Sequence, residues 1–98
     1  MDPDTFKNSV NEDTPPGGLS VPLLALWHVA KGNWDTAHQL ARSANDKDGA
    51  WVHAHLHRVE GNDSNAAYWF ARTDQDTSGL SLDEEWGAIV ETLLLKQA

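Results

Sequence analysis

The chain has 98 residues, with 15 acidic against 7 basic side chains and a net charge of −8. This balance disfavours phosphate backbones and anionic lipid surfaces, so we expect no nucleic acid and no membrane among its partners. The chain has no cysteine, which excludes disulfides, thiol catalysis and cysteine-ligated zinc. Its start does not look like a signal peptide and no apolar run approaches the roughly 20 residues that span a bilayer, so we expect a cytoplasmic protein.

The first 18 residues are poor in large apolar side chains and rich in turn formers, including Pro3, Pro15 and Pro16. Such a segment buries too little apolar surface to offset the entropy lost on ordering. We therefore expect a disordered tail over residues 1–19. One folded domain is expected over residues 20–98.

Apolar spacing and capping residues predict five helices in this domain, at residues 22–31, 34–45, 50–60, 63–73 and 82–96. Ser20 caps the first helix, Gly32 ends it in a left-handed conformation, and Asn33 caps the second. The first helix is apolar on nearly all sides, so we expect it at the centre of the fold. Ser81 and Glu84 form a capping box at the start of the last helix.

Two segments, residues 23–45 and 51–74, repeat the pattern of a helix, a Gly-Asn turn and a second helix. Gly32 and Gly61 mark the two turns at an offset of 29 residues. Repeated hairpins bury a shared core and present an extended face. The expected fold class is therefore all-α, with two antiparallel helical hairpins and a C-terminal capping helix.

The first turn carries the pattern Gly-Asp/Asn-aromatic-Asp/Glu-x-Ala on Gly32, Asn33, Trp34, Asp35 and Ala37. In this respect the chain resembles a tetratricopeptide or Sel1-like helical-hairpin repeat, although its period is shorter than the usual period of about 34. The second copy departs from the pattern at Asp63 and Ser64. It also resembles a family of small uncharacterised proteins, through residues shared around its turn: His57, Arg58, Glu60, Gly61, Asn62, Asn65, Ala66, Tyr68, Trp69 and Phe70. The resemblance implies a fold and no activity.

Histidines give the main indication of a binding site. His53, His57 and Glu60 are spaced i, i+4, i+7 along one side of the third helix, a spacing that suits a divalent metal ion. The repeat offset aligns His28 with His57 and Lys31 with Glu60. If the hairpins stack in parallel, these side chains form a strip on the concave face. The same strip is also typical of an ordinary solvated helix surface.

Three other features have local interpretations. Tyr68 and Arg72, one turn apart and off the apolar arc, form a candidate aromatic anchor for a partner. His55 falls inside the apolar arc and is predicted to be a core histidine with a hydrogen-bonding neighbour. Glu84 and Glu85, at the start of a helix, are expected to favour the helix dipole rather than to act as an acid–base pair.

Two functions remain open from these patterns. The first is a non-enzymatic helical-repeat module that binds a protein or peptide, or a second copy of itself. The second is a small metal- or metabolite-binding protein, conceivably a hydrolase, that uses the histidine and glutamate cluster on the first and third helices. The sequence has no phosphate-binding glycine loop and no nucleophile elbow, so we expect no cofactor and favour a binding protein over an enzyme.

Overall fold

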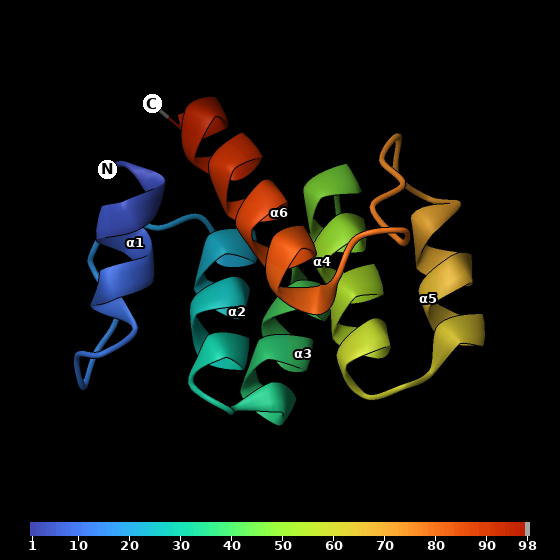
Figure 1. Ribbon diagram of the computed structural model, residues 1–98, viewed down its shortest axis with the longest axis horizontal. Helices are drawn as coiled ribbons and strands as arrows, with labels where there is room; N and C mark the ends of the chain where they lie inside the picture. Colours follow the sequence, from blue (N-terminus) through green and yellow to red (C-terminus); the bar gives the residue numbers. More distant parts are fainter. Residues whose placement is uncertain (98) are drawn as a thin grey trace.

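The computed structural model describes residues 1–97, which form six α-helices and no strand (Figure 1). All five expected helices are present with ends within three residues of the prediction, so the all-α class is confirmed. No helix among the described residues combines the length and apolar character needed to cross a bilayer. The bounds are α1 Pro3–Ser9, α2 Val21–Ala30, α3 Trp34–Ser43, α4 Lys47–Val59, α5 Asp63–Phe70 and α6 Leu82–Gln97.

The two hairpins, α2–α3 and α4–α5, close with the same turn. Gly32 and Gly61 both have a left-handed backbone, with φ of 84° and 82°. The amide of the next residue, Asn33 or Asn62, donates to the carbonyl oxygen four residues before the glycine, at 2.9 Å and 2.8 Å. This is the bond that satisfies a helix's last carbonyls when its C-terminus is left-handed. The Asn62 side chain caps α5, whereas that of Asn33 makes no capping bond.

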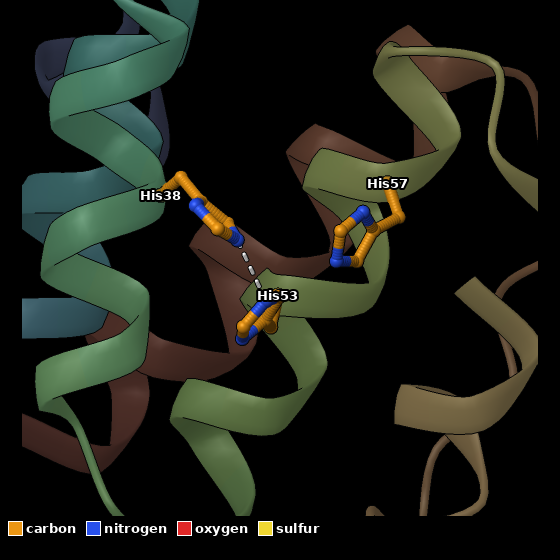
Figure 2. A group of neighbouring side chains, drawn as sticks. All are labelled: His38, His53 and His57. Atoms are coloured by element: carbon orange, nitrogen blue, oxygen red, sulfur yellow. Dashed lines mark hydrogen bonds between the residues drawn. The ribbon is translucent and has the colours of Figure 1, made fainter. Parts of the chain in front are cut away.

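α4 is the centre of the fold, because it packs against α2, α3, α5 and α6 (Figure 1). Every residue from Gly49 to His57 is buried. Two of the buried histidines, His53 and His57, lie toward α3 (Figure 2). The expectation that the helix over residues 22–31 occupies the centre is therefore wrong: α2 contacts only α3, α4 and α6.

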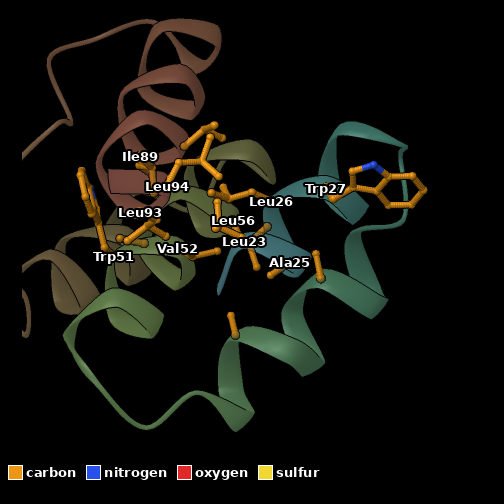
Figure 3. Packing of buried hydrophobic residues seen from close by; sticks show 14 of the residues in the cluster. Leu23, Ala25, Leu26, Trp27, Trp51, Val52, Leu56, Ile89, Leu93 and Leu94 are labelled. Atoms are coloured by element: carbon orange, nitrogen blue, oxygen red, sulfur yellow. The ribbon is translucent and has the colours of Figure 1, made fainter. Parts of the chain in front are cut away.

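α6 lies across both α2 and α4, whereas a cap at the end of a stack would contact the second hairpin alone (Figure 1). The reason is its long apolar face, which is large enough to cover two helices. A cluster of buried apolar side chains lies where these three helices meet (Figure 3). It is formed by Leu23 and Leu26 of α2, Val52 and Leu56 of α4, and Ile89 and Leu93 of α6.

The N-terminal segment contains a helix where a disordered tail was expected, which raises the helix count from five to six. Asp2 caps α1 by accepting the amide proton of Thr5 at 2.7 Å. Phe6 is fully buried, with its ring centroid 5.7 Å from that of Trp86 on α6. The expectation of disorder was based on the average composition of the segment. It missed Phe6, whose single aromatic ring is buried against α6.

A buried ionic network joins α4 to α6. Glu85 is completely buried, and its carboxylate accepts from His55 Nδ1 at 2.6 Å and from Thr77 Oγ1 at 2.6 Å, while Arg58 Nη1 lies 3.0 Å away. Burial by itself raises the pKa of Glu85, but the hydrogen bonds from His55 and Thr77 and the charge of Arg58 outweigh it and hold the pKa below its usual value. His55 is the hydrogen-bonded core histidine that was expected.

The two adjacent glutamates at the start of α6 therefore have different roles. Glu84 forms the expected capping box with Ser81, with both bonds at 3.1 Å. Glu85 was expected to act in the same way and does not, because its side chain points into the protein. The sequence gives no sign of which glutamate faces inward until the packing partner of α6 is known.

This difference predicts unequal costs for two neighbouring substitutions. Glu85→Ala leaves the buried His55 without its acceptor and the partly buried Arg58 without its carboxylate partner, and is expected to lower the free energy of unfolding by about 3–5 kcal/mol. Glu84→Ala removes a cap and is expected to cost about 1 kcal/mol. Urea unfolding followed by circular dichroism measures both. Equal losses in the two variants would show that the buried network contributes nothing beyond a cap.

Candidate metal centre

Three histidines from two hairpins converge between α3 and α4. His53 and His57 are one turn apart on α4, and His38 faces them from α3 (Figure 2). Each ring offers one nitrogen atom, and these three atoms all lie within 4.8 Å of one another. The closest pair is His38 Nε2 and His53 Nε2, 3.0 Å apart. At that distance the N–H of one ring donates a hydrogen bond to the nitrogen of the other ring.

Two tryptophans hold these rings in place. Trp34 stacks on His38 with centroids 4.7 Å apart, and Trp69 stacks on His53 with centroids 3.8 Å apart. The Trp34 indole N–H also donates to the carbonyl oxygen of Leu56 at 2.9 Å, which ties α3 to α4. His53 is only 4 % exposed. The ring positions are therefore set by packing before any ligand arrives.

Glu60 selects the protonation pattern of His57. Its Oε1 lies 2.6 Å from His57 Nδ1, which donates its proton to the carboxylate. The lone pair of this imidazole then belongs to Nε2, the nitrogen used for metal binding when Nδ1 is held by a carboxylate. A carboxylate behind a histidine in this way orients the ring and increases its basicity as a ligand.

Two rings of the histidine cluster, His38 and His53, have a pKa below the ordinary value of 6.5. Burial lowers the pKa of His53 to about 4, with further lowering from His38, His57 and the charge of Arg42. Burial also lowers the pKa of His38, and His57 and Arg42 lower it further. Neutral imidazoles are the form that binds metal ions, so the lowered pKa values of His38 and His53 favour binding.

The donor set suits a first-row divalent transition ion such as Zn²⁺. Three imidazole nitrogens are a known zinc ligand set, and Zn–N bonds of about 2.0–2.1 Å place such nitrogens about 3.3 Å apart. The His38–His53 separation of 3.0 Å is close to that spacing.

The structure brings together only part of the predicted metal set. His53 and His57 belong to the cluster, but Glu60 contacts His57 and is not one of the three converging groups. The expected solvated strip is wrong for the two histidines, because both are buried under α3 and α5. His38 was missed, although its position four residues after Trp34 and three before Ala41 lies on the apolar side of α3.

The remaining predicted residues lie elsewhere. His28 is outside the cluster; its ring lies edge-on to Trp27, and its buried Nδ1 has no partner within residues 1–97. Lys31 Nζ donates to the carbonyl oxygen of Glu12 at 2.8 Å. His28 and His57 therefore do not form a common strip. His57 packs instead against Trp34 and His38 of α3.

The Tyr68–Arg72 pair is formed as expected, between α5 and the turn that follows it. Arg72 Nη1 donates to the Tyr68 hydroxyl at 3.3 Å, and the tyrosine ring is 55 % exposed. The guanidinium also lies 5.5 Å from the ring centroid of Trp69, the residue that stacks on His53. Trp69 therefore lies between Arg72 of this pair and His53 of the histidine cluster.

No protein-family model, curated protein or solved structure matches this chain. The likeness to tetratricopeptide repeats therefore rests on the residues of the two turns and remains a prediction.

Acidification is expected to destabilise the metal-free protein between about pH 6.5 and pH 4. The pKa of His53 is about 4 when folded against an ordinary 6.5, so the unfolded chain binds more protons in this interval. The free energy of unfolding then falls by up to about 1.4 kcal/mol for each such group per pH unit of acidification. Above pH 6.5 the ring is neutral in both the folded and the unfolded chain, so no stability is lost from this source.

Urea unfolding of chelator-treated protein at several pH values measures this slope. His53→Phe keeps an aromatic ring against Trp69 and removes the titration. It should flatten the slope, leaving the smaller part due to His38. A slope that is identical in wild type and His53→Phe would contradict the assignment.

Proposed function

We propose that this protein binds a divalent transition-metal ion, with Zn²⁺ as the preferred candidate, through His38, His53 and His57. The observation that carries the proposal is the convergence of three imidazole nitrogens within 4.8 Å from rings held by two different hairpins. Histidines seldom gather in this way inside a protein, because burying polar rings without partners has a desolvation cost. Glu60 acts behind His57 as the residue that orients it.

Three protein ligands leave a fourth tetrahedral position for water or another ligand, as in catalytic zinc sites rather than closed structural ones. A zinc ion bound in this way makes its water a stronger acid and polarises a bound oxygen. The contribution of this chain is to hold three imidazole rings, with Trp34 stacked on His38 and Trp69 stacked on His53, and to orient His57.

The interaction module suggested by the repeat is the second candidate, on a scaffold that we infer to be a divergent pair of tetratricopeptide-like hairpins. The exposed Tyr68 of α5 and Arg72 just after that helix favour it, because an aromatic ring beside a cation suits the surface of another chain of net charge −8. The partner we propose is a second copy of the protein. Sedimentation across a dilution series tests it: a dimer lost in Tyr68→Ala supports it, and a monomer at all concentrations contradicts it.

Calorimetric titration of the metal-free chain with Zn²⁺ tests the main proposal. We expect one ion per chain with a Kd of about 1 µM or lower, equivalent to about −8 kcal/mol. Glu60→Gln should weaken binding about 10- to 100-fold, the usual effect of losing the carboxylate behind a histidine ligand. His38→Gln and His53→Phe should weaken it further, because each removes a ligand.

The matched control is His28→Ala, which removes a histidine outside the cluster. It should leave the Kd unchanged, and circular dichroism should show that every variant remains helical. A wild-type Kd in the millimolar range, or an equal loss in His28→Ala, would contradict a metal site at the histidine cluster.

A further inference from the structure

A pocket of about 440 Å³ opens directly beside the histidine cluster. Its walls come from the end of α3, the turn into α4, the first half of α4, Trp69 of α5, and Arg72 in the turn after α5. His53 belongs both to this pocket and to the cluster. A molecule in the pocket would therefore lie next to a ligand of the proposed metal ion.

The pocket is rich in cations although the chain is acidic. Three of the seven lysines and arginines in the sequence line it: Arg42, Lys47 and Arg72. The one acidic residue in the wall, Asp46, is directed to the backbone, since its Oδ1 accepts from the Gly49 amide at 2.8 Å. The local charge is thus opposite in sign to that of the whole protein.

Two of these cations are not neutralised by a carboxylate. Lys47 pairs with Asp74 at 2.8 Å, but Arg42 forms no ion pair within residues 1–97, and Arg72 bonds to the neutral hydroxyl of Tyr68. Arg42 follows His38 by one turn of α3, so its guanidinium and the histidine share one side of that helix. Guanidinium groups present paired donors that match the oxygens of carboxylates and phosphates.

We propose that this pocket binds a small oxyanion, a carboxylate or a phosphate, which is held by Arg42 and Arg72 and fills the open position of the metal ion. The inference rests on the proposed metal function, because the ion supplies the contact beside His53. The apolar part of the wall, including Ala41 and Ala50, leaves room for a short hydrocarbon group on the anion. The net charge of −8 disfavours a polyanion and favours a small, free one.

The test uses the full chain loaded with Co²⁺, whose visible absorption responds to a change of ligand. Inorganic phosphate and butyrate are the two anionic probes, and butyramide is the uncharged control. We expect at least one anion to change the spectrum with saturation, and butyramide to leave it unchanged. A response to phosphate alone or to butyrate alone identifies which oxyanion the pocket accepts.

Arg42→Gln and Arg72→Gln are each expected to weaken anion binding at least tenfold while Co²⁺ binding is retained. Lys7→Gln removes the same charge from α1, far from the pocket wall, and should have no effect. If Co²⁺ binds but no anion changes the spectrum, or if both arginine variants bind the anion as wild type does, the oxyanion site is wrong and the metal site stands. If Co²⁺ does not bind, both proposals fail.

Discussion

The structure depends on the enclosure of α4, which is buried over nine successive residues and carries three histidines within that stretch. A buried polar group must find a partner inside the protein, so each ring determines what its neighbours have to supply. On the side facing α6, His55 meets a buried carboxylate, and the result is a charged network that joins two helices. On the side facing α3, His53 meets two other imidazoles and an indole ring and no carboxylate, so its pKa is lowered to about 4 and the neutral ring is favoured.

Short-range signals were sufficient for the helices and their turns. The left-handed glycine that ends α2 recurs at the same place after α4, and the same backbone bond follows it, because both are decided by residues within one helical turn. The Ser81–Glu84 capping box was predicted for the same reason. The core position of His55 also followed from spacing alone, since a residue inside an apolar arc faces whatever covers that arc.

Apart from the Asn33 cap, which makes no side-chain bond, the errors concern contacts between segments far apart in the chain. Phe6 is ordered by Trp86, eighty residues later, and no local pattern shows that a pocket exists there. Glu85 is buried because α6 crosses α4 at that residue. Two of the three histidines in the candidate site were predicted, because His53 and His57 are neighbours on one helix. His38 was missed because its role depends on how closely α3 packs against α4.

The histidine cluster lies between the two hairpins, so a bound ion would affect how they hold together. His38 belongs to the first hairpin and the other two histidines to the second, so an ion that joins them is a cross-link between the hairpins. In a chain without cysteine, an ion bound there would hold the two hairpins together, and it would do so by stabilising the folded state to which it binds. Whether the two hairpins unfold as one unit or separately would then depend on the supply of metal, a reversible control that a covalent bond does not offer.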